Sequence, residues 1–350
     1  MRFEVVELFS ASMKKKLFTI LQYCVFLGLG IFLAWWSLKD LDHEKRHQIK
    51  TALSHARYWL IIPVFAILIA SHLVRAVRWK LLINSLGYRP RTDNTFFAVM
   101  VGYLTNMAVP RLGEVLKCTL LARYEKVPAD KLIGTIILER IIDALSLLFI
   151  FIITLAIQPD LYADLINAFF HSPHDRAKKR ISGYLIAAIF IGMIAIAIFL
   201  WMLIKRKTFN DVIALFKRVG KSIWQGVSAV QHLKRRGLFL FYTFSLWFLY
   251  FLGGYIGLFA LQETQQYGVR EALAILSAGS VGMIATPGGI GAFALLIKKT
   301  MELYGLQEGV ALAFGWILWL VETFVVITGG IFSFVAFPYF NKRKDIPETV

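Results

Sequence analysis

The chain has little cysteine and none of the short motifs that mark soluble catalytic domains. Its two cysteines, Cys24 and Cys118, lie in apolar stretches and form no CxxC pair, which argues against a disulfide framework and thiol-based metal or redox chemistry. The sequence contains no P-loop, no GxSxG elbow and no dinucleotide fingerprint, and His43 and His47 lack an HExxH context. We therefore expect no cofactor, no metal and no catalytic residue of a soluble enzyme.

Charged residues are also scarce, and their scarcity excludes an ordinary soluble domain. Only 17% of the 350 residues are charged, whereas 58% are hydrophobic; soluble domains carry about a quarter charged residues. Apolar runs of about 20 residues recur, the length that a helix needs to cross roughly 30 Å of hydrocarbon. We predict an all-α polytopic membrane protein, with residues 1–350 forming a single integral membrane domain. The expected location is the cytoplasmic (inner) membrane of a bacterial or archaeal cell.

Acidic residues are few, and the basic excess flanks the apolar segments. There are 39 Lys and Arg against 22 Asp and Glu, a formal net charge of +17. Basic residues in such places favour topology control and contact with anionic lipid, so we expect a membrane phospholipid or glycolipid as partner and no nucleic acid. The basic runs at Lys14–Lys16, in Lys205–Arg236 and in the terminal NKRKD predict that both termini and this loop are cytoplasmic.

Six apolar segments are predicted to span the membrane, and two others contain a break. The predicted spans are Leu17–Ser37, Tyr58–Arg78, Lys131–Gln158, Ile181–Ile204, Gly237–Leu261 and Glu308–Phe337. The broken segments are Thr95–Glu125, interrupted near Pro110, and Val269–Tyr304, interrupted at Pro287. With both termini and one loop on the same side, each broken segment must cross an even number of times. We predict two re-entrant helical hairpins, which enter from opposite faces.

The spacing of these segments predicts an internal repeat. Pro110 and Pro287 are 177 residues apart, and a shift of 177 places two spans of the first half on spans of the second. We predict repeat halves over 14–158 and 181–337 with inverted topology, as in many transporters; the alternative is a coincidence of helix spacing. A stripe of apolar residues over 209–233 favours a cytoplasmic interfacial helix, and the alternative is a solvated linker.

The breaks put backbone groups and charge where they favour an anion. Helices that begin near Leu112 and Ile290 would direct free N–H groups toward the bilayer centre, and helix N-termini bind anions such as phosphate. Arg111 adds a bidentate donor suited to phosphate. Gly113 and the glycines of TPGGIGAF permit close approach of the backbone to a ligand or simply permit tight turns.

A second group of charges lies inside apolar helices. The stretch LERIIDAL places Glu139 and Asp143 four residues apart on one helical face, with Arg140 beside them. Charges at membrane depth usually face the bundle interior with partners. Arg75 and Arg78 can pair with these acids, or they can anchor the helix end at inner-leaflet phosphates. The acids can equally form a structural ion-pair network.

The motifs RAVRWKLLINSLG, NMAVPRLGEVLK, LERIIDAL and TPGGIGAF together resemble the membrane region of lysylphosphatidylglycerol synthases, a flippase-like family. The resemblance implies a module that moves aminoacylated phosphatidylglycerol between leaflets, without the separate cytosolic domain that performs lysyl transfer. It also implies the residues of a lipid headgroup site. These are Arg75, Arg78, Asn106, Pro110, Arg111, Gly113, Glu114, Glu139, Arg140, Asp143, Pro287, Gly288, Gly289 and Gly291.

Three functions remain open at this point. The first is a flippase-like carrier of an anionic or aminoacylated phospholipid. The second is a membrane subunit or enzyme of lipid aminoacylation or of polyprenyl-linked glycolipid assembly, for which no catalytic constellation is visible. The third is a scaffold for a lipid-modifying enzyme partner.

The chain departs from the family pattern at one place. Where relatives carry a glutamate after the second break, this chain has Ala292, Phe293 and Ala294, which removes one contact for a cationic headgroup.

Overall fold

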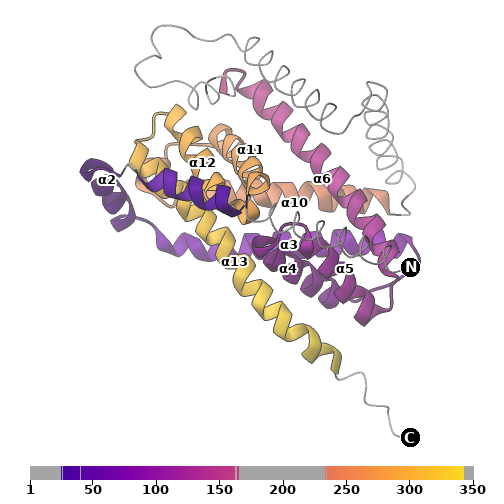
Figure 1. Cartoon of the computed structure of the whole chain (residues 1–350). Coiled ribbons are helices and arrows are strands. Elements are labelled where there is room, and N and C mark those ends of the chain that lie inside the picture. Colours follow the sequence, from indigo (N-terminus) through magenta and orange to yellow (C-terminus); the bar gives the residue numbers. More distant parts are fainter. Residues whose placement is uncertain are drawn as a thin grey trace, which may run out of the picture.

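The computed structural model describes residues 25, 27–39, 41–161, 164, 233 and 235–342 (Figure 1). Over these residues all regular structure is helical and no strand occurs, so the all-α prediction is confirmed. The expected span Ile181–Ile204 lies outside the described residues, as does the expected interfacial helix over 209–233 except its last residue. Of the expected first span, the described part forms the helix Leu27–Lys39.

Nine further α-helices follow this first one among the residues that the structure describes. They are α2 (His43–Ser54), α3 (Ile61–Ser85), α4 (Thr92–Ala108), α5 (Leu112–Glu125), α6 (Ala129–Ile157), α10 (Arg236–Gly257), α11 (Val269–Ala285), α12 (Ala292–Leu303) and α13 (Glu308–Lys342). Among the described residues, four segments are long and apolar enough to cross a membrane: Tyr58–Ser85, Ala129–Ile157, Arg236–Gly257 and Glu308–Asn341. Each overlaps a predicted span, and together they make this a multi-pass membrane protein.

Both broken segments form a helix, a break and a second helix. In the first, α4 ends at Ala108 and α5 begins at Leu112; in the second, a short turn over Pro287–Gly289 separates α11 from α12. Close glycine contacts hold each pair of helices together. A Cβ atom on Gly113 would lie 1.9 Å from the backbone oxygen of Gly102. One on Gly282 would lie 2.5 Å from the Cα of Phe293. Re-entry into a membrane stays a prediction for both pairs.

The two halves of the described chain share one spacing. Adding 177 to the bounds of α4 gives 269–285, which are the bounds of α11. The same shift brings α3, α5 and α6 onto α10, α12 and α13 to within a few residues at most ends. Helices also pack across the two halves: α6 packs on α11, and α13 packs on α4. The repeat and its inverted topology both stay predictions.

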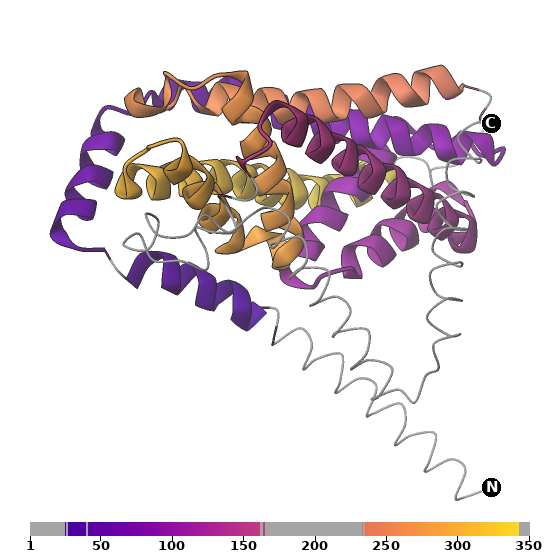
Figure 2. The same ribbon diagram turned by 90° about the horizontal axis from the view of Figure 1, so that it is seen from above.

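Helices α3 and α10 lie side by side and run antiparallel, along the upper edge of the view in Figure 2. Arg78 contacts Thr243 near one end of the pair, and the backbone N–H of Arg57 donates to the carbonyl of Ala260 near the other. Antiparallel packing of two corresponding helices is the geometry that an inverted repeat requires. This pair therefore connects the two halves.

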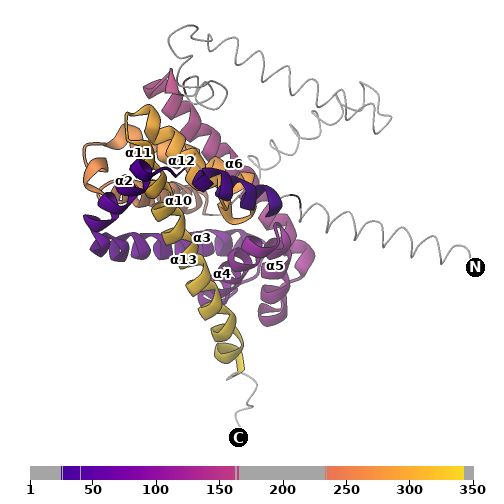
Figure 3. The same ribbon diagram turned by 60° about the vertical axis from the view of Figure 1, so that its left-hand side comes forward.

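Two apolar clusters flank that central pair. One includes Trp79, Phe97 and Leu121, between α3, α4, α5, α6 and the end of α13. The other includes Phe293 and Phe314, between α10, α11, α12 and the start of α13. The helix Leu27–Lys39 lies beside α12 (Figure 3), and a Cβ on Gly291, just before α12, would stand 2.4 Å from the backbone nitrogen of Ala34. Each broken segment therefore contributes to an apolar cluster of its own.

Candidate functional site

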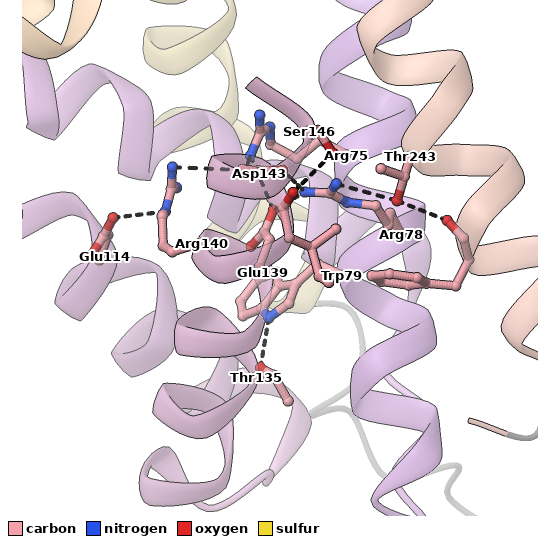
Figure 4. A network of polar contacts seen from close by, with 12 residues as sticks. Arg75, Arg78, Trp79, Glu114, Thr135, Glu139, Arg140, Asp143, Ser146 and Thr243 are labelled. Carbon is pink, nitrogen blue, oxygen red and sulfur yellow. Dashed lines mark hydrogen bonds and ion pairs between the residues drawn. The ribbon is translucent and has the colours of Figure 1, made fainter. Parts of the chain in front are cut away.

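A network of charged side chains joins α3 to α6 inside the helix bundle (Figure 4). Arg75 Nη1 donates to Asp143 Oδ2 at 2.6 Å and to Glu139 Oε1 at 3.2 Å. Arg78 Nη2 donates to Asp143 Oδ1 at 2.6 Å and to the same Glu139 oxygen at 3.2 Å. Each oxygen of Asp143 thus accepts from one arginine of α3, and Glu139 Oε1 accepts from both arginines.

Sequence spacing explains this geometry. Arg75 and Arg78 are three residues apart and Glu139 and Asp143 are four apart, so each pair projects from one face of its helix. Arg78 and Glu139 are fully buried, with no exposed surface on either side chain. Of the alternatives left by the sequence, pairing with the acids is the one observed. Such buried ions need partners, because breaking a buried pair leaves an uncompensated charge and costs about 3–5 kcal/mol.

Lys117 of α5 belongs to the same network, although sequence analysis did not single it out. Its Nζ donates to Glu139 Oε2 at 3.2 Å and lies 4.6 Å from the centroid of the Trp79 ring. The Trp79 indole N–H in turn donates to Thr135 Oγ1 at 2.9 Å. A signal was present, since Lys117 follows Glu114 by three residues and shares its face of α5.

Two more residues form the outer end of the network. Arg140 Nε lies 3.0 Å from Glu114 Oε1, and Arg140 Nη1 lies 4.0 Å from Asp143 Oδ2. The side chain of Arg140 is 42% exposed and that of Glu114 is 32% exposed. An ion pair with this much exposure is weaker than the buried ones, so Arg140 is the cation most available to a ligand.

The network borders a cavity of about 650 Å³. Arg75, Arg140 and Asp143 line it together with Tyr103 of α4 and Tyr250 of α10. The rest of the lining is mainly apolar. It includes Val64, Leu68, Leu147, Leu148, Phe151, Trp247, Ile275, Met283, Ile284, Phe293 and Leu318. A charged end next to a large apolar space suits an amphiphilic ligand.

The network carries a surplus of positive charge. Its members are four basic side chains, Arg75, Arg78, Lys117 and Arg140, and three acidic ones, Glu114, Glu139 and Asp143, for a formal charge of +1. The phenol of Tyr250 accepts a further hydrogen bond from Arg75 Nη2 at 3.2 Å. An excess cation beside an apolar cavity attracts an anionic group.

The breaks form a separate group of the expected residues. Asn106 Oδ1 accepts a hydrogen bond from the backbone N–H of Gly113 at 2.8 Å, which closes the first break. Arg111 has the left-handed conformation (φ 68°), is exposed, and makes no hydrogen bond or ion pair with the residues that the structure describes. Pro110 beside it is half-buried. Thus Arg111 offers an unpaired guanidinium outside the charged network.

The second break lies against the first. A Cβ on Gly288 would stand 3.3 Å from Met107, the residue before the last of α4. Gly288, Gly289 and Gly291 all have positive φ, and the indole N–H of Trp319 donates to the Gly288 carbonyl at 2.8 Å. Pro287 is buried. The residues of the two breaks adjoin one another, but they do not line the 650 Å³ cavity.

A bundle of long apolar helices around a charged cavity defines the class of this molecule as a multi-pass membrane protein. The chain belongs to the family described as Lysylphosphatidylglycerol synthase TM region, which matches residues 20–330. This membership confirms the resemblance carried by the motifs and indicates a lipid-related function.

One similar curated protein is the UPF0104 membrane protein MJ1595 of Methanocaldococcus jannaschii. It is 29% identical over 92 residues, which are 25% of this chain and 27% of that protein. The chain thus spans about a quarter of the length of the relative it matches. No solved structure matches the chain significantly.

Proposed function

We propose that this protein is a flippase-like carrier, which moves a phospholipid with an anionic or aminoacylated headgroup across the cytoplasmic membrane. One observation supports it most: a cavity of about 650 Å³ whose lining carries the charged residues Arg75, Arg140, Asp143 and Glu322 and is mainly apolar elsewhere. A lipid headgroup needs the first kind of lining, and the start of its acyl chains tolerates the second. The family description supports a lipid substrate.

Arg140 is proposed as the first cation to meet the headgroup phosphate. It lies at the exposed end of the network and lines the cavity. Its partner Glu114 comes from the first break, at the N-terminal turn of α5. A phosphate that replaces Glu114 on the guanidinium would release this carboxylate, so ligand binding and movement of α5 are linked. Arg75 of α3 and Asp143 of α6 lie deeper. Their ion pair joins the two helices and holds the cavity's shape.

The repeated helices supply the movement that a carrier needs. Transporters with inverted repeats expose one site to either side by rocking one half against the other. The antiparallel pair α3 and α10, and the packing of α6 and α13 across the two halves, support this assignment. We place both termini on the cytoplasmic side, because basic residues flank the helices there. Arg111, exposed at the first break, is proposed as a second phosphate contact.

The test measures lipid translocation in proteoliposomes that contain the purified protein. Labelled phosphatidylglycerol, its lysyl ester and a polyprenyl-phosphate sugar are compared, because they share a phosphate and differ in charge and chain. We expect one of them to move faster than in protein-free vesicles, and Arg140→Gln to lower that rate about tenfold, since a hydrogen bond to a charged group contributes roughly 1.5–3 kcal/mol.

The matched control is Arg270→Gln. Arg270 is exposed at the start of α11 and lies outside the cavity lining, so this variant should keep the wild-type rate. Folded wild-type protein that accelerates none of the three lipids would contradict the carrier and favour a membrane subunit of a lipid-modifying system. Equal loss of rate in both variants would show that the effect of Arg140→Gln is not specific to the cavity.

A further inference from the structure

A carboxylate stands alone in the middle of the last membrane span. Glu322 is the only charged residue between Glu308 and Lys342, a run of apolar sequence on either side of it. Acidic residues inside a span are rare, cost free energy on insertion and usually serve an ion or proton pathway. Glu322 therefore needs a physical reason to be where it is.

Glu322 lines the same 650 Å³ cavity as Arg75 and Arg140. Its side chain is half-buried, and its carboxylate makes no hydrogen bond or ion pair with any residue that the structure describes. Both cavity arginines already have carboxylate partners of their own. Arg75 is held by Asp143 at 2.6 Å, and Arg140 is held by Glu114 at 3.0 Å.

The groups around the cavity leave Glu322 as its one unpaired acid among the described residues. The titratable and charged groups that face the cavity are Arg75 from α3, Tyr103 from α4, Arg140 and Asp143 from α6 and Tyr250 from α10. From α11 the only polar side chain is Ser280, and α12 contributes only Phe293. Asp143 is neutralised by Arg75 and Arg78. A carboxylate without a cation in such a place can lose its charge by binding a proton.

We propose that Glu322 is a proton-binding site of the cavity, and that its proton is taken up together with the anionic headgroup. The inference rests on the proposed function, because it concerns the same cavity. An ionised Glu322 would repel a phosphate in a shared, poorly hydrated space, whereas a neutral one would not. By linkage, binding of the anion then favours protonation, and protonation favours binding of the anion by the same factor.

The first test detects the proton directly, without any lipid. Infrared difference spectra of the purified full-length protein are recorded between about pH 5 and about pH 9, a range that covers carboxyl groups displaced from their usual titration. The wild type should show a titrating carboxylic-acid C=O band. Glu322→Gln should lose this band, whereas the control Glu44→Gln, at an exposed position of α2, should keep it. A band that persists unchanged in Glu322→Gln overturns the proposal.

The second test measures binding of phosphatidylglycerol to the same proteins at the two ends of that pH range. The wild type should bind at least about fivefold more tightly in acid, the lower end of typical coupling between two sites. Glu322→Gln, which carries a permanently neutral side chain, should bind tightly at both pH values. An unchanged pH dependence in Glu322→Gln contradicts the linkage of proton and anion.

The two tests separate the possible failures. Loss of the band in Glu322→Gln without lipid binding at any pH would leave the proton site standing and overturn the proposed lipid function. If Glu322→Gln yields no folded protein, Glu322→Asp carries the same readouts. Its band should persist with a shifted titration midpoint, and an unshifted midpoint would contradict the assignment.

Discussion

Gly288 in the second break lies against Met107 at the end of α4, and the ideal Cβ of Gly288 would stand 3.6 Å from the Cβ of Met107. The two breaks are about 180 residues apart in sequence, yet they meet in the folded chain. This contact joins the first helix pair, α4 and α5, to the second, α11 and α12. A carrier whose halves rock against one another has to change or slide along this contact.

The first prediction uses that short separation. Disulfides need Cβ atoms roughly 3.5–4.5 Å apart, so Met107→Cys with Gly288→Cys should cross-link on oxidation, in a background where Cys24 and Cys118 are replaced by Ala. The cross-link should stop lipid translocation until a reductant restores it, because the helix pairs α4–α5 and α11–α12 can no longer separate. Mass spectrometry of the linked peptides and the translocation assay provide the two measurements.

A matched pair controls for oxidation itself. Gly134 of α6 has no atom within 4 Å of an added Cβ, so Met107→Cys with Gly134→Cys should not cross-link. A cross-linked Met107–Gly288 variant that still moves lipid at the wild-type rate would show that this contact does not change during transport.

Much of the architecture could be predicted from sequence because its signals are local. Pro110 and Pro287 marked both breaks, and the predicted helix start at Leu112 is the observed start of α5. The partners of buried charges were harder to predict. Arg75 and Arg78 could pair either with the acids of LERIIDAL or with lipid phosphates. Only the packing of α3 on α6 shows that they pair with the acids.

Other parts of the site could not be predicted, or were overlooked. The left-handed backbone of Arg111 is rare for a residue with a side chain, so no sequence pattern indicates it. The join between Met107 and Gly288 depends entirely on tertiary packing. Glu322, in contrast, could have been found in the sequence as a lone acid within an apolar run. It was overlooked because it lies outside all four motifs.

The second prediction concerns the close approach inside the first helix pair. Gly113→Ala would place a methyl group 1.9 Å from the carbonyl oxygen of Gly102 and 2.7 Å from Asn106 Oδ1. Because both atoms belong to the adjoining helix, α4 and α5 must separate. We expect a loss of about 2 kcal/mol or more in unfolding free energy, in the range of overpacked cores. Denaturation in mixed micelles measures it.

Gly134→Ala is the control for helix propensity. It adds the same methyl group in the interior of α6, where nothing lies within 4 Å, so stability should stay the same or rise by about 1 kcal/mol. Similar destabilisation by both substitutions would mean that the close contact between Gly113 and Gly102 is not the reason why Gly113→Ala destabilises the protein.

The third prediction tests whether Glu139 holds the buried network together. It accepts from Arg75, Arg78 and Lys117, each at 3.2 Å. Glu139→Gln leaves Arg75 and Arg78 with only the carboxylate of Asp143, and it leaves Lys117 with no carboxylate among the described residues. We expect a loss of about 3–5 kcal/mol, the cost of breaking a buried ion pair. The double variant Glu139→Gln with Lys117→Met should regain part of it, because one uncompensated charge is removed.

Thermal unfolding in detergent measures all three proteins, and Asp130→Asn is the comparison. Asp130 is exposed in the first turn of α6 and takes no part in the network, so its loss should cost less than about 1 kcal/mol. Equal stabilities of wild type and Glu139→Gln would show that the network is not a structural requirement, and would favour a role of Glu139 in ligand binding.

The last prediction separates the backbone role of Arg111 from its charge. Arg111 has a φ of 68°. This conformation destabilises a residue with a side chain by about 1–2 kcal/mol, whereas glycine adopts it without that cost. Arg111→Gly should therefore keep wild-type stability to within about 1 kcal/mol, since glycine also gains freedom in the unfolded chain. Arg111→Val should be clearly less stable, because β-branched residues tolerate this conformation poorly.

Translocation then assigns the guanidinium its function. If the exposed side chain contacts the headgroup phosphate, Arg111→Gly and Arg111→Gln should both lose transport while remaining folded. Arg111→Lys should retain part of it, because it keeps the charge and loses the bidentate geometry. Wild-type rates in both neutral variants would show that the first break needs only the left-handed turn at this position. Arg140 at the cavity would then be the cation that meets the lipid.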